Sequence, residues 1–326
     1  MQAIPYARLT PDVIMAAVET CGFECTGGIL GLASYENRVY QIGTTEGFVV
    51  TKFYRPGRWS DAEILEEHGF AIELAERDVP VVPPLEHDGE TLHEHDGYRY
   101  AVYERRGGHW PELGTRDERV WLGRFLGRLH AVGATRRFNA RATLSPDDMG
   151  WRSVEELLDS DWIPDHLYAS YRSVTEQILD AVDRCFDEVG DYRHLRIHGD
   201  CHRGNVLWTD DGPHFVDLDD CVTGPAVQDL WLFLAGSRDD MAGQLGELLE
   251  GYTQFFDFDY RELRLIEALR ALRLIHYTAW ITRRWDDPAF PRAFPWLAEP
   301  RYWEEHVQAL LEQRAALDEE PLAVVV

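Results

Sequence analysis

The first hundred residues of this chain alternate short apolar runs with turn residues, a pattern typical of β-strands. Strands are predicted near 27–33, 37–42, 47–54, 81–86, 90–94 and 98–104. One main helix interrupts them over 61–77, where Ser60 and Glu63 form a capping box. We therefore expect an antiparallel sheet with one main helix in this part of the chain.

The remainder of the chain is dominated by helical periodicity, which predicts helices over 115–132, 152–188, 226–256, 260–285 and 300–318. The two patterns meet in the Tyr-Glu-Arg-Arg-Gly-Gly segment at about 103–108. We expect an α+β fold of two lobes around a cleft. The N-terminal lobe spans 1–104, the larger and mostly helical lobe spans 105–326, and the hinge lies at about 103–108.

The composition narrows the possible partners. The chain has a formal net charge of −26, so it has no basic surface to neutralise nucleic-acid phosphates. This charge would instead steer a cationic substrate toward an acidic rim. The sequence contains no secretory signal and no apolar run of about 20 residues, so we expect a cytoplasmic protein without a membrane partner, and a monomer.

The most informative stretch is His-Gly-Asp-Cys-His-Arg-Gly-Asn at 198–205, followed by Phe-Val-Asp-Leu-Asp-Asp at 215–220. Asp200 and Asn205 stand five positions apart, as do the Asp and Asn of a protein-kinase catalytic loop. The residues between Asn205 and Asp217 predict a short hairpin, which would return Asp217 to the side of Asn205.

These three residues match the needs of phosphoryl transfer. Transfer of the γ-phosphoryl group of ATP requires one carboxylate to orient a hydroxyl, and amide and carboxylate oxygens to hold Mg²⁺. We predict that Asp200 and Asp217 are catalytic and that Asn205 and Asp217 bind magnesium.

Lys52 is the only lysine among 32 basic residues, and it lies in an apolar strand that compares with the Val-Ala-Ile-Lys strand of kinases. Arginine could supply charge there, so a lysine indicates that a compact ammonium must fit between phosphates. Compositional drift is the alternative. On the predicted helix, Glu67 is placed to pair with Lys52, whereas Glu66 should face solvent. An ordinary solvated glutamate is the alternative for Glu67.

The candidate phosphate loop is less orderly, because the glycines before the lysine strand do not follow G-x-G-x-x-G. The turn Ser34-Tyr35-Glu36-Asn37 offers a hydroxyl and backbone N–H groups to phosphate oxygens. It is equally explained as a plain hairpin turn.

Together these segments resemble the stress response kinase A family, the YihE-type bacterial Ser/Thr protein kinases, a branch of the aminoglycoside phosphotransferase and choline kinase-like superfamily. The resemblance runs from about residue 10 to about residue 305. It is carried by S-Y-E-N-R-V-Y-Q at 34–41, K-F-Y-R-P at 52–56, I-L-E-E-H at 64–68, the stretch 198–229, R-R-W at 283–285, D-P-A-F-P at 287–291 and F-P-W-L at 294–297.

The resemblance implies a bilobal protein-kinase-like fold with an ATP-binding N-terminal lobe and a catalytic and substrate-binding C-terminal lobe. It also implies that Asp200 accepts the proton of the attacking hydroxyl and that Ser34 and Lys52 contact ATP. The implied activity is ATP- and Mg²⁺-dependent phosphorylation of protein serine or threonine, with autophosphorylation, in a cytoplasmic stress response.

Some features differ from ordinary protein kinases or stay open. Gly199 replaces the arginine of H-R-D, and there is no room for a long activation segment, so activity should not be gated by phosphorylation there. Asp219 and Asp220 either join the metal shell or orient the loop. Five cysteines, an odd number, argue against a disulfide framework. Cys201 and Cys221 are either inert thiols or a redox switch that silences the enzyme.

Three alternatives remain at this point. The nearest is a small-molecule kinase acting on an aminoglycoside, choline or homoserine-like hydroxyl, because the same catalytic loop serves such acceptors. The second is a nucleotide-binding pseudokinase. The third is a metallohydrolase built on His198, Asp200 and His202, or on the histidines at 87, 93 and 95.

Overall fold

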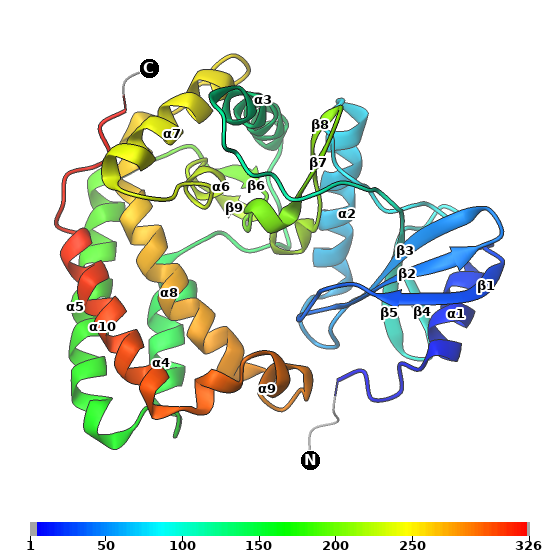
Figure 1. The fold of residues 1–326 in the computed structure, drawn as a ribbon, viewed down its shortest axis with the longest axis horizontal. Helices are drawn as coiled ribbons and strands as arrows, with labels where there is room; N and C mark the ends of the chain where they lie inside the picture. Colours follow the sequence, from blue (N-terminus) through cyan, green and yellow to red (C-terminus); the bar gives the residue numbers. More distant parts are fainter. Residues whose placement is uncertain (1–4, 325–326) are drawn as a thin grey trace.

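The computed structural model of the protein describes residues 5–324. A β-sheet at one end of the molecule faces a larger helical part, and a long helix lies between them (Figure 1). This agrees with the predicted α+β class.

The sheet has five antiparallel strands in the order β1-β2-β3-β5-β4. They span Cys25–Gly31 (β1), Arg38–Thr44 (β2), Gly47–Phe53 (β3), His93–His95 (β4) and Tyr98–Glu104 (β5). Helix α1, Pro11–Thr20, packs its buried Ile14 and Val18 against the sheet in one apolar cluster. The sequence pattern had not indicated this helix.

The strand predicted over 81–86 is wrong. This segment forms only isolated bridges, Val81 with Phe215 and Pro84 with Tyr103. Prolines at 80, 83 and 84 remove the N–H donors that a ladder needs. The strand predicted over 90–94 is shortened to the three residues of β4.

Helix α2, Asp61–Glu76, begins at the predicted capping box, in which Ser60 and Glu63 bond reciprocally. Its Phe70 and Leu74 are buried in the main apolar core of the helical part. The helix is therefore held by the C-terminal part while it also contributes Glu67 to the sheet side.

The helical part contains α3 (Arg116–Gly133), α4 (Arg152–Leu158), α5 (Asp165–Val189), α6 (Gln228–Trp231), α7 (Arg238–Tyr252), α8 (Ile266–Arg283), α9 (Ala289–Ala293) and α10 (Pro300–Ala316). Two predicted helices are interrupted. Pro164 precedes α5 and separates it from α4, and Gly236, at φ +97°, lies in the break between α6 and α7.

Two small antiparallel ladders lie beside the cleft. They pair β6 (Leu195–Ile197) with β9 (Val222–Gly224), and β7 (Val206–Thr209) with β8 (Gly212–Phe215). The second is the predicted hairpin. Within residues 5–324 no helix is long and apolar enough to cross a bilayer.

The sheet ends at Glu104, and residues 105–108 have no regular structure. We propose this segment as the hinge between the lobes, at the boundary predicted from the sequence.

Candidate active site

The loop after β6 is held by a buried aspartate. Asp229 accepts hydrogen bonds from the backbone N–H groups of His198 (2.7 Å) and Gly199 (2.9 Å), and its Oδ2 also lies 3.0 Å from His130 Nε2. Asp229 and His130 are fully buried. Sequence reasoning gave neither residue a role, because their partners are about 30 and 100 residues away.

The backbone at position 199 requires a glycine, where ordinary protein kinases have the arginine of H-R-D. Its φ is +85°, and a Cβ at this position would lie 2.1 Å from the carbonyl oxygen of Asp220. The 198–205 loop can therefore approach the 218–220 turn only with glycine at this position.

Asp200 follows directly and is held by two side chains. Its Oδ1 lies 2.6 Å from Nη1 of Arg273 on α8, and its Oδ2 lies 3.3 Å from His202 Nε2. Burial alone would raise the pKa of Asp200, but His202 and Arg273 outweigh it and hold that pKa below its ordinary value. Asp200 is thus ionised. Its partner Arg273 was not predicted.

The predicted hairpin places Asp217 beside Asn205. The Val216 N–H donates to the Asn205 carbonyl at 3.0 Å, and Asn205 Nδ2 donates to the Asp200 carbonyl at 3.0 Å. Asp217 has a left-handed backbone (φ 60°, ψ 62°), which is uncommon for a residue other than glycine. Its side chain is 48% exposed and lines the cleft.

Lys52 lies on β3, with its ammonium among three carboxylates. Nζ is 2.8 Å from Glu67 Oε1, 2.8 Å from Asp219 Oδ1 and 3.5 Å from Asp217 Oδ1. The predicted pair with Glu67 is present. Burial alone would lower the pKa of Lys52, but Asp219 and Glu67 raise it well above its ordinary value, so the amine is charged.

Asp219 and Asp220 have arginine partners. The Arg58 guanidinium bonds to both carboxylates, and Asp219 is only 2% exposed. The Asp219 carboxylate is thus paired with Lys52 and Arg58. This favours a role in orienting the loop over a role as a metal ligand.

Arg141 ties α2 to the same turn. Its Nη2 lies 3.2 Å from Glu67 Oε2, and its Nη1 donates to the Asp219 carbonyl at 2.5 Å. Glu66 is partly exposed, as expected, but it is not simply solvated. Its carboxylate accepts the backbone N–H groups of residues 139–141 at 2.7 to 3.0 Å, because that loop crosses the outer side of the helix.

The turn at 34–37 is fixed by the far end of the chain. The Glu36 carboxylate lies 2.8 Å from Arg55 Nε, 2.6 Å from Trp280 Nε1 and 2.5 Å from Arg284 Nε. Asn37 is buried and accepts the Arg55 N–H at 3.1 Å, so it shapes the turn. Ser34 faces the cleft.

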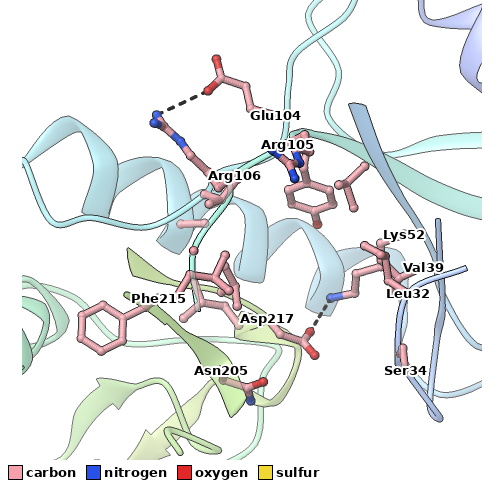
Figure 2. A pocket seen from close by; sticks show the side chains of 18 of the residues that line it. Leu32, Ser34, Val39, Lys52, Glu104, Arg105, Arg106, Asn205, Phe215 and Asp217 are labelled. Carbon is pink, nitrogen blue, oxygen red and sulfur yellow. Dashed lines mark hydrogen bonds and ion pairs between the residues drawn. The ribbon is translucent and has the colours of Figure 1, made fainter. Parts of the chain in front are cut away.

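A cavity of about 480 Å³ lies between the sheet and the catalytic loop. Figure 2 shows Lys52 reaching from the sheet toward Asp217, with Asn205 below and Ser34 on the neighbouring loop. Glu67 lines the cavity as well. Five predicted site residues are therefore brought together here, while Asp200 lies just outside the lining and faces α8.

Much of the cavity lining is apolar. Residues 104–108, which include the proposed hinge, line the cavity as well, and Figure 2 shows Glu104, Arg105 and Arg106 above Asp217. Its apolar walls come from both lobes: Leu32, Val39, Val50, Ala71, Leu207, Phe215 and Leu218. Such a slot suits a flat aromatic ring.

His198 does not face the cleft. Its ring is fully buried, and Nε2 lies 3.0 Å from the Val216 carbonyl. Across the described part of the chain, no three His, Cys, Asp or Glu side chains gather as ligands for one metal ion. Nothing at His198 supports the histidine-based hydrolase alternative.

Comparisons with known proteins agree with this geometry. The phosphotransferase enzyme family (APH) matches residues 28–266. "Stress response kinase A" of Escherichia coli K12 and "Serine/threonine protein kinase RdoA" of Salmonella typhimurium LT2 are each 44% identical over 322 residues, covering 98% of this chain and 97% of theirs. The solved structure of amicoumacin kinase hAmiN, at 18% identity, superposes with a TM-score of 0.73 over 96% of this chain and 95% of its own.

Proposed function

This chain belongs to the phosphotransferase enzyme family and, within it, to the stress response kinases, and we propose that it transfers the γ-phosphoryl group of ATP to serine or threonine hydroxyls of proteins. One observation carries the proposal. The charged amine of Lys52 lies in the same cavity as Asn205 and Asp217, and Glu67 fixes it at 2.8 Å.

ATP would lie with its adenine in the apolar slot and its phosphates toward Lys52. The backbone of residues 104–108 would meet the edge of the adenine ring. The Ser34 hydroxyl and the N–H groups of its turn would meet phosphate oxygens. The side chains of Glu36 and Asn37 are hydrogen-bonded to other parts of the chain, so the protein itself supports the shape of this turn.

The side chains of Asn205 and Asp217 fit a magnesium ion. Asn205 uses its Nδ2 for Asp200, which leaves Oδ1 as an acceptor. The Asp217 carboxylate is half-exposed in the cavity and keeps a looser contact of 3.5 Å with Lys52. Oxygen donors of these types suit Mg²⁺, which when bound would neutralise phosphate charge.

Asp200 would orient the acceptor hydroxyl. The hydroxyl oxygen forms a bond to the γ-phosphorus, the bond to the bridging oxygen breaks, ADP leaves, and the hydroxyl proton passes by way of Asp200 to water. Because the pKa of Asp200 is lowered, its main contribution is alignment, which suits a loose transition state that needs little base strength.

Three parts of this proposal rest on the similarity to the named kinases and on the family motifs. They are the protein acceptor, autophosphorylation and a role in a cytoplasmic stress response. The test is to incubate purified protein with Mg²⁺ and γ-labelled ATP, adding casein as a generic acceptor or a panel of aminoglycosides, choline and homoserine. We expect label on the enzyme and on casein serine or threonine. Label on a small alcohol alone would establish the small-molecule alternative, and no transfer at all would establish the pseudokinase.

A further inference from the structure

The Asp200 carboxylate is bound by Arg273, whose guanidinium has further N–H donors. Arg273 Nη1 lies 2.6 Å from Asp200 Oδ1, and 38% of the Arg273 side chain is exposed. Among residues 5–324, its Nη2 and Nε have no hydrogen-bond partner. The guanidinium is partly buried and has N–H groups without a partner. It lies next to the position proposed for the acceptor hydroxyl, so it can bind a carboxylate of the acceptor.

Apart from Asp217, the proposed magnesium ligand, the nearby carboxylates described here are paired with arginines of the chain. Arg58 binds both Asp219 and Asp220, and Arg55 lies 2.8 Å from Glu36. In the same region Asp287 is bound by Arg38 and Arg55 and is 2% exposed. An acceptor with an ammonium group would need a free acid to replace its hydration. Here it would instead meet the charge of Arg273.

Two exposed tyrosines extend the surface next to Arg273. Tyr277 lies one turn further along α8 and is 40% exposed, and Tyr35 of the 34–37 turn is 47% exposed. Both rings pack on Phe294, at centroid distances of 6.3 Å and 5.0 Å. Rigid phenol rings that carry a polar tip are suited to contact a peptide chain.

We propose that Arg273 is a positioning and specificity residue, which fixes Asp200 through Nη1 and binds, through Nη2 and Nε, the carboxylate of an aspartate or glutamate that flanks the phosphorylated serine or threonine. This inference rests on the proposed protein kinase activity and names its acceptor class. It replaces the expectation of a cationic substrate drawn from the net charge. Salt screens that overall field beyond about 8 Å, whereas the Arg273 contact is direct.

The test compares two peptides with the same serine, one flanked by glutamates and one by lysines. For the wild-type enzyme, kcat/KM should be about tenfold higher with the glutamate peptide, as expected for one charge-assisted contact. Arg273→Gln should reduce this preference to less than about twofold. It should leave the KM for ATP unchanged, because Arg273 does not line the cavity.

A split between kcat and KM separates positioning from mere packing. Arg273→Gln removes the Nη1 contact that fixes Asp200, so kcat should fall by about tenfold with either peptide while the KM for ATP stays unchanged. Arg270→Gln is the matched control, since it removes the same charge one turn earlier on α8, where Arg270 pairs with Glu267. It should keep both the peptide preference and the kcat of the wild-type enzyme.

The outcomes separate this inference from the proposed activity. If the wild-type enzyme phosphorylates both peptides equally, or Arg273→Gln keeps the preference, the inference fails and the kinase assignment stands. If the wild-type enzyme labels amine alcohols and no peptide or protein, the proposed activity itself fails. Should Arg273→Gln not fold, Arg273→Lys decides. It should retain a weaker glutamate preference, and an unchanged preference and kcat would overturn the role of the guanidinium.

Discussion

Arg38 and Asp287 lie 249 residues apart in the sequence, yet Arg38 Nη2 is 2.9 Å from both oxygens of Asp287. Arg55 Nη2 reaches the same carboxylate at 2.7 Å. Two arginines of the sheet lobe are thus bound by one buried acid from the link between α8 and α9. The 34–37 turn is anchored beside this contact by Glu36, so the contact fixes the proposed phosphate loop relative to the catalytic lobe.

Replacing Asp287 should therefore destabilise the protein and weaken nucleotide binding together. Asp287→Ala leaves the largely buried guanidinium of Arg38 without its acid and that of Arg55 with Glu36 alone, a loss of about 3 kcal/mol. Urea unfolding and ATP titration would measure both effects. The adjacent exposed Asp286→Asn is the control and should change stability by less than about 0.5 kcal/mol. Normal ATP affinity in Asp287→Ala would show that the turn does not depend on this anchor.

Asp217 and Asp219 should behave differently despite their shared motif. Asp217→Asn should lose the magnesium dependence of nucleotide binding, because it weakens a proposed ligand. Asp219→Asn should keep that dependence yet lower kcat, because it frees one side of Lys52. Magnesium titrations of nucleotide binding in the two variants give the comparison. Loss of magnesium dependence in both would place Asp219 in the metal shell.

Asp200→Asn should retain ATP binding and lose transfer. The amide keeps the size of the side chain, and Asp200 lies outside the cavity lining, so the nucleotide site stays intact. Loss of the orienting carboxylate should lower kcat by roughly a thousandfold. The autophosphorylation rate and the ATP affinity, measured on the same preparation, test the expected loss of transfer and the expected retention of ATP binding. A loss of ATP affinity to match the loss of turnover would contradict this role.

The sequence predicted the residues whose partners are set by short-range geometry. Lys52 and Glu67 lie on adjacent elements, and the hairpin that joins Asn205 to Asp217 is only a few residues long. Spacing and periodicity are enough in such cases.

Other site residues depend on contacts between distant segments. Arg58, Arg141 and Arg273 are three of 31 arginines, and nothing local distinguishes them from solvated ones. Asp287 opens the D-P-A-F-P segment at 287–291 that carries the family resemblance, yet its partners lie on the other lobe. The strand predicted over 81–86 is absent for a local reason, because prolines 83 and 84 lack the N–H groups that a ladder needs.

The cysteines near the site should be unreactive in the folded protein. Cys201 and Cys221 are fully buried, and burial raises the pKa of both thiols, so neither forms the thiolate that peroxide attacks. Peroxide should leave kinase activity unchanged. A thiol reagent should label at most the half-buried Cys25 in native protein and all five cysteines after denaturation. Inactivation by peroxide that Cys201→Ser or Cys221→Ser prevents would restore the redox-switch hypothesis.

Glu262 should make stability depend on pH near neutrality. It is 1% exposed, and its Oε2 accepts the Val227 N–H at 3.0 Å. Burial raises its pKa to about 7, against about 4.3 in an unfolded chain. Between these values the folded state binds more protons. The stabilisation from this group is therefore complete below about pH 4.3 and is lost as the pH rises through about 7.

Glu262→Gln should remove this dependence, because the amide cannot ionise and still offers an oxygen to Val227. The free energy of unfolding of the variant, relative to wild type, should rise by about 2 kcal/mol between pH 5 and pH 8. Urea unfolding at both pH values measures it. The exposed Glu176→Gln on α5 is the control, with no such difference expected. A constant offset between Glu262→Gln and wild type would mean that Glu262 is ionised throughout this range, held so by its backbone donor despite its burial.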